Sequence, residues 1–195
     1  MLLKKQREAL TPTFTRHFIT NILNFTIMKR INFIAILLGV FTSCSTMQNI
    51  NNETVETLDL NKYVGQWYEI ARFDHFFECG MDHNKAEYTL CDDGTVSVHN
   101  SGFKDGKVKE VSGTAKTTDN PGLLRVSFFK PFYSDYRVLY IDADYQYALV
   151  GCGNSDYLWI LSRTTYIDPI AKKNILSEAT RRGYNIDNFI WVDQE

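Results

Sequence analysis

Four cysteines and four histidines are the side chains of this sequence most suited to act as nucleophiles, general bases or metal ligands. Their spacing matches no common site of that kind. Cys91 has no Cys-x-x-Cys partner, and Gly151-Cys152-Gly153 is too short for a phosphate-binding loop. The sequence also has no zinc-ligand spacing and no pair of catalytic carboxylates. It therefore favours a binding protein over an enzyme, with no metal and no cofactor.

Cys44 follows a segment with the order of a secretory signal. Two basic residues, an apolar run over residues 31–41 and two small residues precede it. The run is shorter than the roughly 20 apolar residues that a transmembrane helix needs. The order resembles the signal of bacterial lipoproteins, in which the cysteine at the cleavage point is acylated, although Phe41 stands where Leu is usual. We expect a lipoprotein signal over residues 28–43 and lipidation of Cys44; a plain secretory signal or a short buried helix is the alternative.

The remaining boundaries follow from this signal. Residues 1–27 precede a second Met that begins a complete signal, so we expect them to be an over-translated upstream segment. Residues 44–56 then form a lipidated tether, and residues 57–195 form one domain. Ser45 replaces the Asp that commonly retains bacterial lipoproteins in the inner membrane. The resemblance therefore implies the periplasmic face of the outer membrane, an oxidising compartment.

The net charge argues against nucleic acid as a partner. The whole chain carries 21 Lys and Arg against 23 Asp and Glu, a net charge of −2. The first 43 residues contain six of these cations and one acid, so the rest of the chain carries a net charge of −7. Nucleic-acid binding requires a basic surface.

Short runs rich in β-branched and aromatic residues recur along the rest of the chain, separated by turn residues such as Asp92-Asp93-Gly94. The runs often alternate: Leu124, Val126 and Phe128 stand opposite two polar residues, which gives one apolar face. Eight strands joined by hairpins can close into a barrel with room for one small ligand. The eight predicted strands are residues 67–73, 86–91, 96–103, 109–117, 123–129, 136–141, 147–152 and 157–163.

The periodicity changes after the last of these strands. Asp168-Pro169 is typical of a helix N-terminus, and Arg181-Arg182-Gly183 is typical of a helix end. The narrow apolar stripe between them predicts one amphipathic helix packed outside the barrel. Residues 189–192 are expected to return as a strand on the barrel wall.

Three sequence blocks resemble the lipocalin family. Gly65-Gln66-Trp67 matches its G-x-W signature on the first strand, and Tyr136-Arg137-Val138 and the block over residues 157–163 follow in the family order. The residues in these blocks are most similar to those of bacterial outer-membrane lipocalins and of apolipoprotein D. The resemblance implies an all-β fold, an eight-stranded antiparallel up-and-down lipocalin barrel with one C-terminal helix outside. It also implies that Arg163 stacks on Trp67 at the closed end of the barrel.

Strict alternation from Trp67, helped by the lipocalin strand pattern, predicts which side chains face inward. The inward set is mostly apolar, as expected for a pocket that holds an amphipathic ligand, although a solid core is the alternative. Glu69 would also face inward and needs a partner, either Tyr88 or Tyr140, unless the alternation slips there. The predicted ligand-binding residues are Ala71, Tyr88, Val98, Asn100, Val126, Phe128, Tyr136, Val138, Tyr140, Val150 and Trp159.

The resemblance to bacterial lipocalins implies a fatty acid or a lysophospholipid as the ligand, held for lipid storage, transport or envelope maintenance. A protein tethered to the membrane would collect such lipids beside the bilayer. Four aromatic residues are expected at the open end, where they could guide the ligand, contact a membrane or contact a second copy in a homodimer: Phe76, Phe77, Phe132 and Tyr133.

The cysteines and histidines leave two rival functions open. The meander places Cys79 and Cys152 at the open end, so we expect a disulfide between them and a free Cys91. If Cys152 were free and inward, the protein could instead be a lipocalin-type enzyme that uses this thiol on a lipid. A haem lipocalin would need one of three histidines, which we expect at the surface: His75, His83 and His99.

Overall fold

The computed structural model describes residues 49–195. The predicted upstream segment, the signal and Cys44 lie outside the described residues. Among residues 49–195, no helix is long and apolar enough to cross a membrane.

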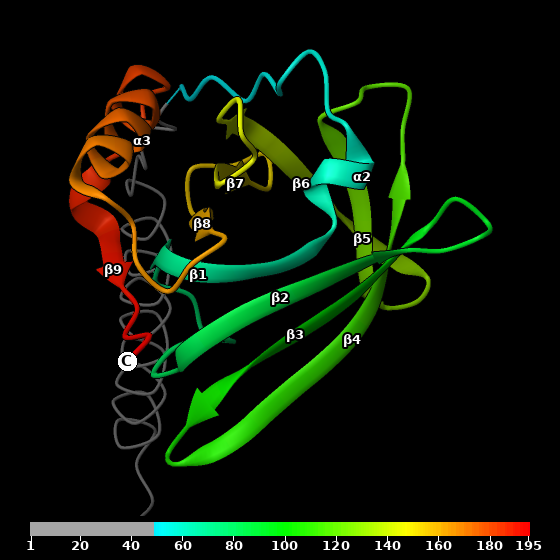
Figure 1. The fold of residues 1–195 in the computed structure, drawn as a ribbon, viewed down its shortest axis with the longest axis horizontal. Coiled ribbons are helices and arrows are strands. Elements are labelled where there is room, and N and C mark those ends of the chain that lie inside the picture. Colours follow the sequence, from blue (N-terminus) through cyan, green and yellow to red (C-terminus); the bar gives the residue numbers. More distant parts are fainter. Residues whose placement is uncertain (1–48) are drawn as a thin grey trace, which may run out of the picture. The chain divides into compact units, whose positions relative to one another are not determined.

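Eight strands form an antiparallel barrel (Figure 1). Each strand pairs with the next one along the chain, and β1 pairs with both β2 and β8, so the sheet closes on itself. The predicted eight-stranded barrel with one helix outside is confirmed. The strands are β1 (Gly65–Phe73), β2 (Asp82–Leu90), β3 (Val96–Lys104), β4 (Lys107–Thr117), β5 (Leu123–Phe129), β6 (Phe132–Ile141), β7 (Tyr147–Gly151) and β8 (Leu158–Ser162).

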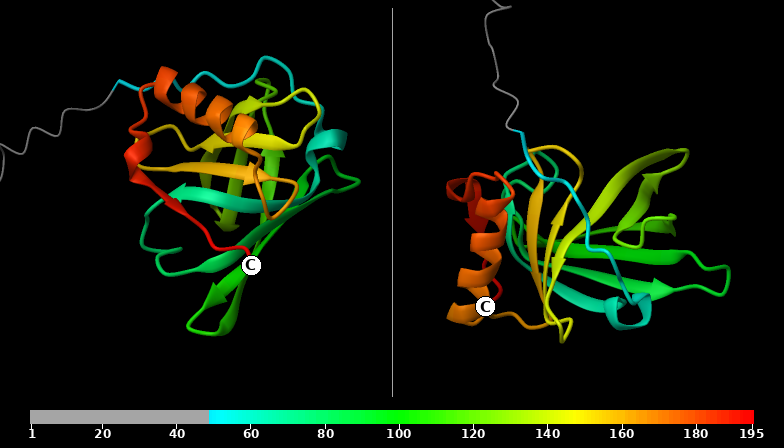
Figure 2. Two further views of the ribbon diagram at one scale, coloured as in Figure 1. Left: turned by 60° about the vertical axis from the view of Figure 1, so that its left-hand side comes forward. Right: turned by 90° about the horizontal axis from the view of Figure 1, so that it is seen from above.

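One long helix, α3 (Pro169–Arg181), lies against the outside of the barrel (Figure 2). It begins where the sequence predicts, because the Asp168 carboxylate accepts hydrogen bonds from the backbone N–H groups of Ile170 and Ala171. It ends before Gly183, whose φ of 88° is unfavourable for other residues. A 3₁₀ turn (Ile186–Asn188) and strand β9 (Phe189–Trp191) follow, and β9 pairs with the end of β1.

The two ends of the barrel are built differently. A short helix that the sequence did not indicate, α2 (Leu60–Tyr63), lies at the closed end, where β1 begins. The long connection between β1 and β2 and the hairpins that join β3 to β4, β5 to β6 and β7 to β8 lie at the open end.

The first described residues lie beside the open end. Asn52 donates a hydrogen bond to the carbonyl of Gly153, in the connection between β7 and β8. The chain then runs the length of the barrel, because the Asp59 N–H donates to the hydroxyl of Tyr145 at the closed end. In the left view of Figure 2 this cyan segment starts on the side toward which the arrow of β1 points.

Two apolar clusters divide the core. One fills the barrel interior around Trp67, Val98 and Val138, and the other lies between the barrel wall and α3 around Ile160 and Ile175. Residues on β8 alternate between the clusters as strict alternation predicts. On β1 and β6 the alternation fails, because each strand has an irregularity in its pairing, between Glu69 and Ala71 and between Val138 and Tyr140.

These irregularities correct two predicted ligand contacts. Ala71 and Tyr140 were expected inside the barrel, but both belong to the cluster against α3. Strict alternation from Trp67 would also place Phe73 inside, but its ring packs edge-to-face on Phe189 in the cluster against α3, with centroids 4.8 Å apart. A β-bulge moves every following side chain to the other face of the strand.

Candidate functional site

The closed end is held by a stacked pair on the signature residues. The Arg163 guanidinium lies 3.8 Å from the ring centre of Trp67, a cation–π contact in the arrangement that the resemblance implies. The Trp67 indole N–H donates to the carbonyl of Tyr63 over 2.7 Å. Gly65 has a φ of 97°, and a Cβ there would lie 3.4 Å from Arg163 Nη1. Gly65 and Trp67, together with Arg163, therefore hold α2 against the start of β1.

Arg163 also satisfies the backbone of this end. Its Nη2 donates to the carbonyls of Lys62, Tyr63 and Val64 over 2.6 to 3.0 Å, and its Nη1 donates to the carbonyl of Gln66 over 2.8 Å. Charge-assisted hydrogen bonds of this kind are among the stronger ones in proteins. One side chain thus supports the whole turn from α2 into β1.

Three tyrosines lie next to this pair inside the barrel. The Tyr136 hydroxyl is 2.7 Å from that of Tyr63 and 3.0 Å from that of Tyr88. Burial raises the pKa of all three phenols, to about 12 for Tyr88, so they are neutral at physiological pH. Because the hydroxyls satisfy each other, this cluster needs no ligand.

The interior opens progressively toward the mouth. At the closed end only a cavity of about 10 Å³ separates Tyr63, Val96, Leu124 and their neighbours. Val126 also borders this cavity, and further along Phe128 and Trp159 face inward but are only half-buried. The interior is therefore filled at the closed end, and toward the mouth the inward side chains of Phe128 and Trp159 are partly exposed to solvent.

Most of the predicted ligand-binding residues face this interior. Asn100 shares the inner face of β3 with Val98, and its Oδ1 is buried without a hydrogen-bond partner. The inward residues of the predicted set are Tyr88, Val98, Val126, Phe128, Tyr136, Val138, Val150 and Trp159, all in the interior cluster.

A buried polar cluster at the mouth was missed from the sequence. It consists of Glu69, Arg72, His75, Glu78, Asn84 and Trp159, and we call it the mouth cluster. Alternation placed Arg72 outside, but the bulge in β1 turns it inward, where it is 2% exposed. The unpaired inward carboxylate of Glu69 was the one signal that a partner had to exist.

Arg72 joins the barrel wall to the loop over the mouth. Its Nη1 donates to Glu69 Oε1 over 2.8 Å, and its Nη2 donates to the carbonyls of Glu78 and Met81 over 2.8 and 3.0 Å. Asn84 Nδ2 also donates to Glu69 Oε1, over 3.2 Å. The expected partners of Glu69, Tyr88 or Tyr140, are thus replaced by Arg72 and Asn84.

The loop carboxylate of Glu78 completes the mouth cluster. The Trp159 indole N–H donates to Glu78 Oε2 over 3.2 Å, and His75 Nε2 lies 3.1 Å from the same oxygen. Burial raises the pKa of Glu69 and of Glu78, and repulsion from Glu78 raises that of Glu69 further. Burial and the nearby Arg72 lower the pKa of His75 to about 4, so His75 is neutral at pH 7.

Comparisons with known proteins identify the family. The family model described as a lipocalin-like domain matches residues 58–194. This chain is a lipocalin. It is 46% identical over 144 residues to the outer membrane lipoprotein Blc of Escherichia coli, covering 72% of this chain and 81% of that protein. The Vibrio cholerae protein of the same name is 40% identical over 146 residues, covering 72% of this chain and 85% of that protein.

More distant relatives share the fold. Mouse apolipoprotein D is 32% identical over 179 residues, covering 83% of this chain and 93% of that protein. The solved structure of insecticyanin from Manduca sexta superposes with a TM-score of 0.63 at 21% identity, covering 73% of this chain and 84% of that one. The cockroach allergen Per a 4 gives a TM-score of 0.61 at 23% identity, covering 76% and 96%. The relationship to Blc indicates a lipid-anchored protein of the outer membrane.

The cysteines of this lipocalin do not form the predicted pair. Cys79, Cys91 and Cys152 are free thiols in the structure. The loop of Cys79 is held by Lys104, whose Nζ donates to its carbonyl over 2.7 Å, whereas the Cys152 thiol contacts Asn154 in the connection between β7 and β8. Cys79 and Cys152 thus contact different segments at the open end.

The thiol and haem alternatives find little support in the described residues. Burial raises the pKa of Cys152, which disfavours the reactive thiolate. His83 and His99 are bonded on the outer surface to Asp82 and Ser112, and His75 faces Glu78. Among residues 49–195, no group of three or more His, Cys, Asp or Glu is arranged to hold a metal ion.

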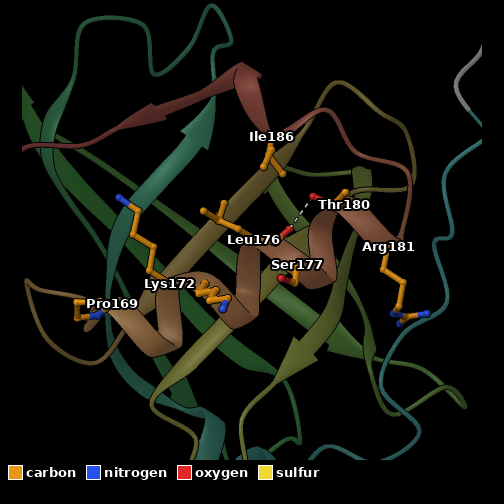
Figure 3. A pocket seen from close by; sticks show the side chains of 8 residues that line it. Pro169, Lys172, Leu176, Ser177, Thr180, Arg181 and Ile186 are labelled. Carbon is orange, nitrogen blue, oxygen red and sulfur yellow. Dashed lines mark hydrogen bonds between the residues drawn. The ribbon is translucent and has the colours of Figure 1, made fainter.

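A groove of about 650 Å³ lies on the outer side of α3 (Figure 3). Long polar side chains such as Lys172 and Arg181 border it, and the apolar part is limited to residues such as Leu176 and Ile186. It is separated from the barrel interior by the cluster around Ile175. The groove offers a shallow, solvated surface instead of an enclosed apolar site.

Proposed function

We propose that this lipocalin holds a single-chain lipid, a fatty acid or a lysophospholipid, inside its barrel for storage, transport or maintenance of the envelope. The observation that carries the proposal is the one-sided interior. It is filled around Tyr63 and Tyr136 at the closed end, whereas the inward side chains of Phe128 and Trp159 toward the mouth are partly exposed to solvent. An acyl chain can enter this apolar space while its polar end stays at the mouth cluster.

Burial of the chain supplies the affinity without any chemical step. Each methylene removed from water contributes about 0.8 kcal/mol. A chain of a dozen or more carbons would outweigh its loss of conformational freedom. The partial exposure of Phe128 and Trp159 supports this, because an acyl chain in the interior would bury more of their apolar surface.

The open end is the end that faces the membrane in this proposal. Asn52 lies beside Gly153 at the mouth, and the eight residue steps from Cys44 to Asn52 span at most about 29 Å. Acylation of Cys44 would therefore hold the mouth close to the bilayer. An apolar rim surrounds the mouth: Phe76 is 86%, Phe77 49%, Phe129 76% and Phe132 77% exposed.

This rim is suited to a bilayer surface. Large exposed aromatic side chains gathered at one end of a soluble domain mark an interaction site, and aromatic rings are favoured at the lipid–water interface. In the expected arrangement the rim touches the headgroup layer, and a lipid leaves the bilayer and enters the barrel without crossing water. A homodimer through the same rim is the competing arrangement.

Native mass spectrometry tests the proposal. The soluble chain from residue 44 onward with Cys44→Ser is mixed with oleate or with an oleoyl lysophospholipid. We expect one bound lipid per chain. Val126→Trp, which fills the interior, should abolish binding, whereas Ser177→Trp in the groove beside α3 should leave it unchanged; circular dichroism checks that both variants are folded. Binding that survives Val126→Trp and is lost in Ser177→Trp would overturn the interior site.

A further inference from the structure

Strand β4 has a neighbouring strand on only one side over most of its length. β3 pairs with β4 from Lys107 to Ala115, whereas β5 pairs with it only from Thr114 to Thr117. In the part of the chain that the structure describes, no strand pairs with the other side of Lys107–Gly113, which we call the β4 edge. Residues 107–112 are all exposed. Backbone N–H and C=O groups of alternate residues in this segment therefore face solvent.

The two strands separate at Gly113. A Cβ there would lie 2.7 Å from Phe128 Cδ1 and 2.7 Å from the carbonyl oxygen of Ser127, so only glycine leaves room for the end of β5. The hairpin that follows leaves the β4 edge uncovered, since Val108 is 55% and Val111 39% exposed. The pairing of β5 with β6 is irregular in the same region, between Val126 and Phe129. The free edge is thus a built feature of the barrel wall.

The two faces of the β4 edge differ in chemistry. Residues opposite each other on antiparallel strands share a face. Lys104 lies opposite Lys107, so these two side chains and that of Lys109 lie on one face. Among residues 49–195, neither Lys107 nor Lys109 forms an ion pair. On the other face Val108 lies opposite the 42% exposed Phe103. One face is therefore basic, and the other has an exposed apolar pair.

A second copy of this chain fits the β4 edge poorly. Antiparallel pairing of two copies through the same edge would place Lys107 and Lys109 of both copies on one face of the joined sheet. Like charges on neighbouring strands destabilise their pairing, and lysines on an edge strand discourage pairing between copies. An acidic strand would instead neutralise these lysines.

We propose that the β4 edge is a docking site for a protein partner that adds an extended segment in which acidic and apolar residues alternate. The backbone of this segment pairs with the free N–H and C=O groups between Lys107 and Gly113. Its acidic side chains lie beside Lys107 and Lys109, and its apolar side chains lie beside Val108 on the other face. The β4 edge is separate from the mouth cluster, so the same molecule can hold a lipid and a protein partner together.

Peptide binding and hydrogen exchange test this site. The soluble Cys44→Ser chain is titrated with a short capped peptide that alternates Glu and Val, and with one of equal length that alternates Lys and Val. We expect the acidic peptide to bind roughly ten-fold more tightly, because each opposite-charge pair across strands adds to the affinity. At saturation it should slow exchange of the solvent-directed amides between Lys107 and Gly113 by about five-fold or more. Equal binding of the two peptides, or unchanged exchange of these amides, would overturn the docking site.

Charge reversal assigns the preference to this edge. Lys107→Glu combined with Lys109→Glu should reverse it, so that the basic peptide binds more tightly. Lys85→Glu combined with Lys173→Glu makes the same change in net charge at two exposed lysines away from the edge and should leave the preference for the acidic peptide intact. Circular dichroism checks that both double variants are folded. A preference for the acidic peptide that survives the reversal at Lys107 and Lys109 would contradict the site.

A modified peptide distinguishes strand addition from attraction between charges alone. The acidic peptide with N-methyl groups on two consecutive central residues cannot pair through either of its edges, so its binding should be lost. Binding equal to that of the unmodified peptide would overturn the proposal. Protection of the same amides that rises with protein concentration in the absence of peptide would show a second copy at the edge, and would overturn it as well.

Discussion

The two ends of the barrel differ in whether their buried polar groups have hydrogen-bond partners. At the closed end the Trp67 indole, the hydroxyls of Tyr63, Tyr88 and Tyr136 and the Arg163 guanidinium all have hydrogen-bond partners. At the open end Arg72 Nε, Asn84 Oδ1 and Asn100 Oδ1 are buried without one. Their surroundings differ as well, since the closed end is filled and the open end carries exposed aromatic side chains.

This difference indicates that the closed end contributes mainly to stability and the open end mainly to binding. Satisfied polar groups and dense packing make a rigid base, which holds the strands in register. Unsatisfied groups and exposed apolar surface lower stability and persist where a ligand or a membrane completes them. Changes at the closed end should therefore alter the free energy of unfolding, and changes at the open end should alter binding.

The largest expected effect is the loss of Trp67. Trp67→Ala removes a fully buried ring and the surface on which Arg163 stacks, so the free energy of unfolding should fall by about 3–5 kcal/mol. Urea denaturation followed by circular dichroism measures it. Trp191→Ala, at a ring that is 42% exposed, is the matched control and should cost much less. Equal losses of unfolding free energy in the two variants would contradict a special role of the closed end in stability.

Replacement of Arg163 should have the next largest effect. Arg163→Lys keeps the charge but cannot reach the carbonyls of Lys62, Val64 and Gln66 together, so we expect a loss of about 2–3 kcal/mol. Arg125→Lys, at an exposed ion pair with Asp135, should cost at most about 0.5 kcal/mol. The same denaturation experiment compares them, and a harmless Arg163→Lys would contradict the structural role of this side chain.

The open end should respond to pH through His75. Its pKa is about 4 in the folded protein and near 6.5 when unfolded, so its contribution to stability is present above 6.5 and is lost as the pH falls toward 4. The loop amides of Glu78 and Cys79 donate to the His75 carbonyl, so their hydrogen-exchange protection should decrease over this range.

A His75→Asn variant isolates this effect. The raised pKa of Glu78 acts in the opposite direction, so the native protein and the variant must be compared at each pH. The variant should lose the part of the pH dependence between 6.5 and 4. Protection that falls equally in both proteins would show that His75 does not control the loop.

The smallest expected effect concerns the apolar rim. Phe132→Ser should weaken binding of the soluble chain to phospholipid vesicles by a factor of about two to five, because one ring contributes a modest apolar area. Ile170→Ser is the control, because Ile170 is 73% exposed at the start of α3, away from the mouth. Sedimentation with vesicles measures both. An equal loss for Ile170→Ser would mean that the rim has no special role.

Sequence reasoning succeeded where local patterns decide the structure. Turn residues and alternation predicted the strands, and Asp168-Pro169 and Gly183 predicted the limits of α3, because these signals act over a few residues. The G-x-W block implied the contact between Trp67 and Arg163, which lie far apart in the sequence.

The mouth of the barrel could not be predicted in this way. The bulge between Glu69 and Ala71 turns Arg72 inward, and a one-residue irregularity leaves no mark in the hydrophobic pattern. The bulge next to Tyr140 likewise turns that side chain to the face of β6 opposite to the one that alternation predicts. The loop that carries Glu78 is positioned by Arg72 and Trp159, so its course depends on contacts that only the folded barrel brings together.

The position of the bound lipid tests most directly whether the barrel interior is the binding site. Isotope-filtered NMR on the soluble chain with bound oleoyl lysophosphatidylethanolamine detects contacts between lipid and protein protons. We predict contacts from the acyl chain to Val126 and Phe128 and from the headgroup to the Trp159 indole. Contacts confined to Leu176 and Ile186 in the groove beside α3 would contradict the assignment of the barrel interior as the binding site.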